Sequence, residues 1–205
     1  MALKQTIEKL KNGEDLKIVA IGDSLTCGWM VGKGYTAFLK DMLSVNFPGS
    51  MIQMIDGGVP GGTAAGGLSR MENQVIRYHP DLVLIQFAIN DAFSGYTVDE
   101  FRENIIGMIS KIENETSADM LLVTSGALDD SDRKLVGKYY DALQDIAEDK
   151  GIPIALVHEY WERKINEGIR FEGLVQRDGV HPTEEGHRLM AEAILHAMKQ
   201  SFLKP

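Results

Sequence analysis

The chain has 205 residues, 44% of them hydrophobic and 25% charged, which is an ordinary composition for a globular protein with one sizeable core. Its formal net charge of -9 repels nucleic acid and anionic membranes, so neither is expected as a main partner. The single cysteine, Cys27, excludes an internal disulfide.

Residues 1–17 alternate charged and apolar side chains and contain no continuous apolar segment of the kind that a signal peptide needs. We therefore expect a cytoplasmic protein, unless a leader has been trimmed from the chain. No apolar run is as long as a membrane span, so no membrane-spanning helix is expected. The oligomeric state stays open, because no feature of the sequence bears on it.

Five short runs dense in Val, Ile and Leu predict β-strands that are covered on both faces. In chain order these runs are Lys17–Ile21, Met51–Ile55, Leu82–Ala88, Asp119–Thr124 and Ile152–Val157.

Helices are predicted between the strands. Thr97 and Glu100 have the spacing of a capping box, and the apolar residues that follow repeat along one helical face. Three apolar stripes carry this prediction: Phe101, Ile105, Ile109 and Ile112; Leu135, Tyr139, Leu143 and Ile146; and Leu189, Met190, Ala193, Ile194 and Ala197. Two further segments also read as helical, Tyr35–Val45 and Leu68–Tyr78.

Alternating strands and helices predict an α/β fold with a five-stranded, mainly parallel sheet and helices on both faces. No linker or change of composition divides the chain, so a single domain over residues 1–205 is expected. In such sheets the functional residues lie on loops that follow the carboxyl ends of the strands.

The first candidate for chemistry is a serine directly after the first predicted strand. Ser24 lies in Gly22-Asp23-Ser24-Leu25-Thr26, where a strand meets a turn. A serine hydroxyl is a weak nucleophile unless a base accepts its proton. Taken alone, this stretch fits a helix cap or a turn slightly better than a nucleophile.

The second candidate is the segment Asp178-Gly179-Val180-His181-Pro182, just before the last predicted helix. An aspartate three residues before a histidine can hold one ring nitrogen and leave the other free to face a serine. The segment could equally be a surface loop whose polar residues cap the helix.

Two further loops could supply hydrogen-bond donors to an oxyanion. Asn90 lies just after the third predicted strand, where its amide could serve as a donor or simply close a turn. The glycine-rich stretch Asp56–Thr63 follows the second strand and could offer backbone N–H groups. It matches neither common nucleotide-binding glycine motif. Together the four elements supply a nucleophile, a base, an orienting group and oxyanion donors, which are the parts needed for acyl transfer.

The four blocks resemble those of the SGNH, or GDSL-type, hydrolases in order and separation. They are GDSLT at Ser24, the glycine loop at Gly61, AIND at Asn90 and DGVH from Asp178 to His181. Among the branches of that family, the chain is most similar to the compact bacterial acylesterases, thioesterases and lysophospholipases. The resemblance covers nearly the whole chain, and it implies a flavodoxin-like three-layer α/β/α sandwich.

The resemblance also implies roles for individual residues. Ser24 is expected to be the nucleophile, His181 the base and Asp178 the group that orients His181. The oxyanion hole is expected to consist of the N–H groups of Ser24 and Gly61 and the Asn90 side chain. The implied mechanism needs no metal or organic cofactor.

The chain departs from the family pattern at two positions. Ala88 stands where the third block usually has glycine, so a methyl group could crowd the turn or shift Asn90. Asp56 stands where the second block often has asparagine, which could add a negative charge near the oxyanion.

Other side chains near the blocks could line a substrate pocket, and we name Asp23, Trp29, Asp91 and Phe93. Ordinary packing or a turn explains each of them at least as well. The histidines outside the DGVH block show no metal-ligand spacing, so no metal site is expected; they are His79, His158, His187 and His196.

The sequence therefore predicts a serine esterase that acts on a small-molecule ester or thioester of a small or medium acyl group. A carbohydrate O-acetyl esterase is the alternative within the enzyme class. A non-catalytic relative that only binds a ligand is the alternative outside it. We expect activity to decline on acidification, because His181 must be neutral to accept a proton.

Overall fold

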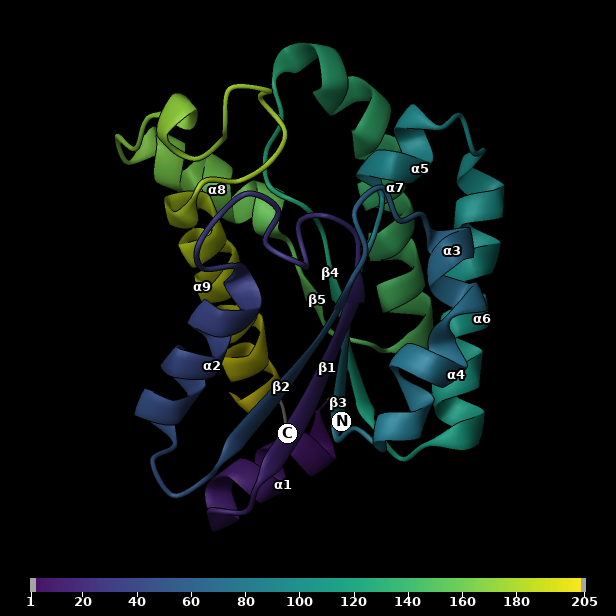
Figure 1. Cartoon of the computed structure of the whole chain (residues 1–205), viewed down its shortest axis with the longest axis vertical. Helices are drawn as coiled ribbons and strands as arrows, with labels where there is room; N and C mark the ends of the chain where they lie inside the picture. Colours follow the sequence, from purple (N-terminus) through teal and green to yellow (C-terminus); the bar gives the residue numbers. More distant parts are fainter. Residues whose placement is uncertain (1–2, 204–205) are drawn as a thin grey trace.

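Five parallel strands form one sheet at the centre of the protein, in the order β2-β1-β3-β4-β5 (Figure 1). The structure is a computed structural model that describes residues 3–203, with only the backbone described at residues 130, 131 and 203. The strands are β1 (Leu16–Gly22), β2 (Ile52–Gly58), β3 (Leu82–Gln86), β4 (Asp119–Val123) and β5 (Ile154–Ala155).

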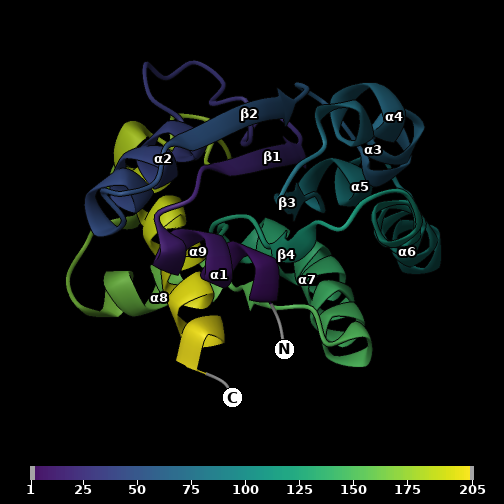
Figure 2. The same cartoon turned by 90° about the horizontal axis from the view of Figure 1, so that it is seen from below.

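Helices cover both faces of this sheet. The α-helices are α1 (Lys4–Asn12), α2 (Tyr35–Asn46), α3 (Ala64–Ser69), α4 (Met71–Gln74), α5 (Ile89–Phe93), α6 (Val98–Glu115), α7 (Asp130–Lys150), α8 (Val157–Asn166) and α9 (Glu184–Leu203). Two short 3₁₀ helices are η1 (Ile76–Tyr78) and η2 (Phe171–Gly173). One layer holds α2, α8 and α9, the other holds α3 to α7, and α1 lies across the lower end of the sheet (Figures 1 and 2). This architecture confirms the predicted three-layer α/β/α fold.

The central strands are the most completely buried part of the chain. Residues Ile18 to Ile21 of β1 and Leu82 to Gln86 of β3 have no exposed surface, because helices cover the sheet on both sides. The predicted capping box at Thr97 and Glu100 is present at the start of α6, and its apolar stripe faces the core.

Several predicted boundaries were wrong. The helix predicted over Leu68–Tyr78 is broken into α3, α4 and η1, because the backbone leaves helical geometry at Arg70 and Val75. In α7 Leu135 is 41% exposed, and Val136 takes the buried place instead. The last strand is only Ile154–Ala155, since Pro153 has no N–H to donate and α8 begins at Val157.

The sheet register brings the carboxyl ends of the strands to one edge. Gly58, Gly22 and Gln86 are neighbours across β2, β1 and β3, and Gln86 is followed in turn by Val123 and Ala155. The loops after all five strands therefore start side by side, as the predicted placement of the candidate residues requires.

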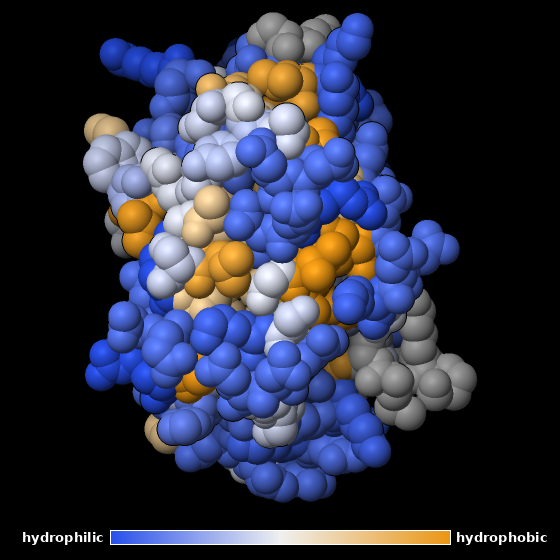
Figure 3. Space-filling model, turned by 90° about the vertical axis from the view of Figure 1, so that its right-hand side faces the viewer, coloured by the Kyte–Doolittle hydropathy of each residue, from blue (hydrophilic) through white to orange (hydrophobic). Residues whose placement is uncertain are grey.

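One face of the protein is mainly hydrophilic. Figure 3 shows the side that carries α3 to α6, where small hydrophobic patches are scattered among hydrophilic side chains. In the described part of the chain, no helix has both the length and the apolar character that crossing a membrane would need.

Candidate active site

Ser24 lies in a tight turn that folds back on the end of β1. The Asp23 carboxylate accepts a hydrogen bond from the N–H of Leu25 at 2.8 Å, and the Ser24 carbonyl accepts one from the N–H of Trp29 at 3.0 Å. A Cβ atom on Gly22 would lie 2.0 Å from Thr26 Oγ1, so only glycine permits this close return of the chain. The turn leaves Ser24 6% exposed at the edge of the sheet.

A buried polar network supports the turn from beneath. Gln86, at the end of β3, accepts a hydrogen bond from Thr26 Oγ1 at 2.9 Å through its side-chain oxygen. Its side-chain nitrogen donates to Ser125 Oγ at 3.0 Å and to Asp23 Oδ2 at 3.4 Å. One glutamine therefore holds the residues on both sides of Ser24 and links them to the loop after β4.

His181 lies in a closed loop between η2 and α9. The loop is fastened at its base, where the N–H of Thr183 donates to the Leu174 carbonyl at 2.9 Å and Thr183 Oγ1 donates to the Gly173 carbonyl at 2.7 Å. Near its tip, the N–H of Gln176 donates to the His181 carbonyl at 2.7 Å. These bonds fix the backbone from which the imidazole projects.

The loop brings His181 and Asp178 against Ser24. His181 Nε2 lies 3.0 Å from Ser24 Oγ, and His181 Nδ1 lies 2.8 Å from Asp178 Oδ2. The other carboxylate oxygen, Asp178 Oδ1, accepts hydrogen bonds from the N–H groups of Val180 and His181, both at 2.9 Å. The three side chains form one hydrogen-bonded chain from carboxylate to hydroxyl.

The surroundings of Asp178 favour its ionised form. Partial burial raises the pKa of Asp178, but the hydrogen bonds from the Val180 and His181 backbone, together with the His181 ring, outweigh burial and hold that pKa below its usual range. An ionised Asp178 keeps a proton on His181 Nδ1 and leaves Nε2 free to accept one from Ser24.

Gly61 and Asn90 follow β2 and β3, the two strands that flank β1. Gly61 has φ 73° and is the third residue of the turn Val59–Gly62, with Pro60 before it, which is the pattern of a type II turn. Asn90 Nδ2 donates to the Gly62 carbonyl at 3.0 Å, so the two loops are joined. Within residues 3–203, the N–H groups of Ser24 and Gly61 have no hydrogen-bond partner and remain available as donors.

Asp23 and Asp91 lie beneath the site and not on a surface open to substrate, contrary to the expectation that they line a pocket. Asp23 is 1% exposed, and Asp91 is fully buried with Oδ1 accepting the N–H of Ala64 at 2.9 Å. Burial raises the pKa of Asp23 to about 7 and that of Asp91 to about 6. Their backbone contacts make them supports for the loops that carry Ser24 and Asn90.

The other two residues named for a pocket are at the surface. Trp29 is 43% exposed and Phe93 is 47% exposed. Trp29 belongs to the loop after Ser24, and its carbonyl accepts a hydrogen bond from Gln176 at 3.1 Å. This bond fastens the serine loop to the histidine loop.

The two departures from the family pattern, Ala88 and Asp56, lie outside the hydrogen-bonded chain of Ser24, His181 and Asp178. Ala88 is fully buried and is the N-cap residue of α5, and its carbonyl accepts a hydrogen bond from the N–H of Ala92 at 2.9 Å. Asp56 is the fifth residue of β2 and not part of a loop, and it accepts a hydrogen bond from Thr36 of α2 at 3.0 Å.

The described residues contain no group of three or more His, Cys, Asp or Glu side chains arranged to hold a metal ion.

The sequence motifs and this geometry agree with a family comparison, in which residues 20–189 match the model of the GDSL-like lipase/acylhydrolase family. The chain belongs to this family. Membership confirms the predicted class, a GDSL-type hydrolase with a serine esterase chemistry.

Three curated relatives of this GDSL-family protein are esterases. An arylesterase of Vibrio mimicus is 26% identical over 87% of this chain and 86% of its own length. An acetylxylan esterase of Geobacillus stearothermophilus is 25% identical over 91% of this chain and 95% of its own. The esterase TesA of Pseudomonas aeruginosa is 24% identical over 89% of this chain and 87% of its own.

Solved structures support the same fold. LAE5, an α/β hydrolase from the metagenome of Lake Arreo, has a TM-score of 0.79 and 23% identity over 90% of this chain and 95% of its own. A two-domain esterase active on acetylated mannans has a TM-score of 0.84 and 24% identity over 98% of this chain and 54% of its own.

Sequence reasoning missed two residues that shape the site of this GDSL-family chain. Gln86 could have been noticed as the one polar residue in the apolar strand LVLIQ. Arg70 gave no signal, yet its guanidinium donates to the Gly22 carbonyl at 2.7 Å and lies 5.7 Å from the centre of the Phe87 ring. It holds the end of β1 next to the turn of Ser24.

Proposed function

We propose that this protein is a serine esterase that hydrolyses an ester or thioester of a small or medium acyl group through an acyl-enzyme on Ser24. The observation that carries the proposal is the continuous contact from Asp178 through His181 to Ser24, at 2.8 Å and 3.0 Å. This is the arrangement in which an oriented imidazole removes the proton of a serine hydroxyl.

In the proposed first half-reaction, His181 Nε2 takes the Ser24 proton while Ser24 Oγ forms a bond to the acyl carbon. The negative charge on the carbonyl oxygen is held by the N–H groups of Ser24 and Gly61 and by the Asn90 amide. The bond to the leaving alcohol or thiol then breaks, and His181 returns the proton to that group.

In the second half-reaction, water attacks the acyl carbon and gives its proton to His181. The carboxylic acid leaves, and Ser24 Oγ recovers its proton. Asp178 stays ionised throughout and stabilises the imidazolium form of His181 in both halves.

A second candidate is the removal of acetyl groups from carbohydrate. The relative from Geobacillus stearothermophilus, which aligns with 91% of this chain, is an acetylxylan esterase. Such an enzyme uses the same acyl-enzyme and differs only in the alcohol that leaves.

The proposal is tested by hydrolysis of p-nitrophenyl acetate, butyrate and octanoate, with wild type and Ser24→Ala compared at equal concentration. We expect turnover by the wild type and background rates from the variant, and covalent labelling by a fluorophosphonate in the wild type alone. A folded wild type that neither turns over these esters nor takes the label would refute the esterase and favour a ligand-binding protein. A preference for acetate over octanoate would support the carbohydrate candidate.

A further inference from the structure

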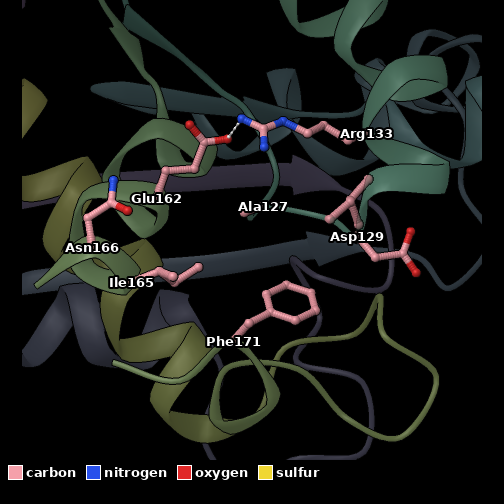
Figure 4. Close-up of a pocket in the computed structure, with 8 residues that line it drawn as sticks. Ala127, Asp129, Arg133, Glu162, Ile165, Asn166 and Phe171 are labelled. Atoms are coloured by element: carbon pink, nitrogen blue, oxygen red, sulfur yellow. Dashed lines mark hydrogen bonds and ion pairs between the residues drawn. The ribbon is translucent and has the colours of Figure 1, made fainter. Parts of the chain in front are cut away.

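A cavity of about 390 Å³ opens at the same edge of the sheet as Ser24, between the loop after β4, the start of α7, α8 and η2 (Figure 4). This volume is within the range of pockets that bind small molecules, about 300 to 1,000 Å³. None of the groups assigned to acyl transfer lines it. The cavity is therefore a separate feature of the site region that the proposed mechanism does not explain.

The walls of the cavity combine an apolar surface with a few polar groups. Ala127, Ile165 and Phe171 provide apolar contact, with the Phe171 ring on one side of the opening. Across from it lies the ion pair of Arg133 and Glu162. Asn166, one residue after Ile165 on α8, adds an amide that can both donate and accept.

Both walls continue into the segments that hold the catalytic groups. Ala127 lies two residues after Ser125, which accepts a hydrogen bond from Gln86 at 3.0 Å, and Gln86 also donates to Asp23 next to Ser24. Phe171 begins η2, whose last residue, Gly173, is tied to Thr183 two residues after His181. A substrate whose ester lies at Ser24 can therefore extend toward this cavity.

The charges of the cavity disfavour an anionic ligand. Glu162 neutralises Arg133, and the whole chain carries a net charge of -9. A phosphate or a coenzyme A tail would meet net repulsion here.

The polar groups equally disfavour a long acyl chain. An alkyl chain is stabilised by burying its methylene groups against apolar walls. However, an alkyl chain would separate Arg133, Glu162 and Asn166 from water without offering them a hydrogen bond, and this loss opposes binding. The ligand that suits these walls is neutral, with one apolar face and several hydroxyl groups.

A pyranose ring has this chemistry, since its C–H groups form an apolar face and its hydroxyls surround the rim. We propose that the cavity is a subsite for a neutral sugar ring of the substrate. Phe171 packs against the C–H face, and Asn166 and the Arg133–Glu162 pair bind the hydroxyls. The inference rests on the proposed serine esterase function and names its leaving group, a sugar hydroxyl that departs with the proton held by His181.

A neighbouring cavity of about 260 Å³ gives the subsite room to extend. It shares Ala127, Arg133 and Glu162 with the first and continues toward Tyr140 and His158. The Arg133–Glu162 ion pair therefore lines both cavities. An oligosaccharide could place one sugar ring in each cavity, with the ion pair between the two rings.

The kinetic test compares Phe171→Ala with the control Phe47→Ala on two substrates. Both phenylalanines are half-buried at the periphery of the core, but Phe47 packs against Phe202 at the end of α2, away from the cavity. We expect Phe171→Ala to lower kcat/KM for acetylated xylotriose at least tenfold more than for p-nitrophenyl acetate. Phe47→Ala should change kcat/KM by the same factor for both substrates. An equal loss on both substrates in Phe171→Ala would overturn the subsite and leave the esterase standing.

A binding test is independent of turnover. Ser24→Ala is titrated with xylotriose, sodium octanoate or inorganic phosphate while backbone amide NMR shifts are followed. We expect xylotriose to shift the amides of Ala127, Asn166 and Phe171, and Asn166→Ala introduced into this protein to weaken the response severalfold. Shifts at these amides with octanoate or phosphate but not with xylotriose would overturn the proposal. If the wild type neither turned over p-nitrophenyl acetate nor reacted with the fluorophosphonate, the esterase function itself would be refuted.

Discussion

At the scale of single residues, Asn90 is the side chain whose role is easiest to isolate. Its amide is joined to the Gly62 carbonyl at 3.0 Å, which leaves its second N–H for an oxyanion. An oxyanion is present only in the transition state and the tetrahedral intermediate, so its donors affect kcat more than KM.

We expect Asn90→Ala to lower kcat for p-nitrophenyl acetate by about 100- to 1,000-fold, as the loss of one oxyanion donor usually does. The value of KM should change little. Steady-state kinetics on the folded variant, checked by circular dichroism, measures both constants. A fall in kcat/KM that comes entirely from KM would contradict an oxyanion role.

Asp23, next to the proposed nucleophile Ser24, shows how the burial of a carboxyl group affects stability. Burial raises the pKa of Asp23 to about 7, although hydrogen bonds from Leu25 and Gln86 lower it and the nearby Asp91 raises it further. The folded protein therefore keeps a proton on Asp23 at pH values where the unfolded chain has released it. The ionisation of Asp23 therefore lowers the free energy of unfolding as the pH rises from about 4 to 7.

We predict that the wild type loses stability relative to Asp23→Asn by up to about 1.4 kcal/mol for each pH unit between 4 and 7. The comparison between the two proteins is needed because burial lowers the pKa of His158 and of His187 to about 4, and this acts in the opposite direction. Urea unfolding at pH 5, 6, 7 and 8 gives the free energies. Parallel curves for the two proteins would show that Asp23 does not titrate in this window.

At the scale of elements, the turn after β1 depends on a close approach that only glycine allows. A Cβ atom on Gly22 would lie 2.0 Å from Thr26 Oγ1 and 2.8 Å from the Gln86 carbonyl. The second of these atoms is backbone in the central strand β3, so it cannot move aside cheaply.

We expect Gly22→Ala to destabilise the fold by about 3 kcal/mol or more and to abolish esterase activity. The matched control is Gly137→Ala in α7, where an added Cβ meets nothing within 4 Å. Alanine has a higher helix propensity than glycine, so the free energy of unfolding of this control should rise by about 0.5 to 1 kcal/mol. Thermal and urea unfolding of both variants test the pair, and a Gly22→Ala protein as stable as the control would be the contrary result.

At the scale of the whole molecule, the net charge of -9 acts on every substrate that approaches. Neutral esters are indifferent to it, whereas anionic esters are repelled over distances set by the ionic strength. The effect is separate from the chemistry at Ser24, because it changes only the rate of encounter.

We predict that kcat/KM for a carboxylate-bearing ester, mono-p-nitrophenyl succinate, rises between 20 and 300 mM NaCl. The value for neutral p-nitrophenyl acetate should stay within about twofold, since screening has no charge on that substrate to act on. Initial rates at low substrate concentration give both values. If kcat/KM responded equally to salt for the two esters, the negative surface charge would have no effect on how an anionic ester approaches the site.

The sequence by itself determined the layers of the fold, and it named the residues that we propose carry the reaction. Ser24, Asp178 and His181 each stand in a short motif, and strands, helices and the capping box at Thr97 follow from local periodicity and local hydrogen bonds. Tertiary structure alone decided that Asp23 and Asp91 are buried supports, that Gln86 and Arg70 hold the turn of Ser24, and that a cavity forms beside Phe171. These features join residues that are far apart in the chain, and a contact of that kind leaves no periodic or local pattern in the sequence.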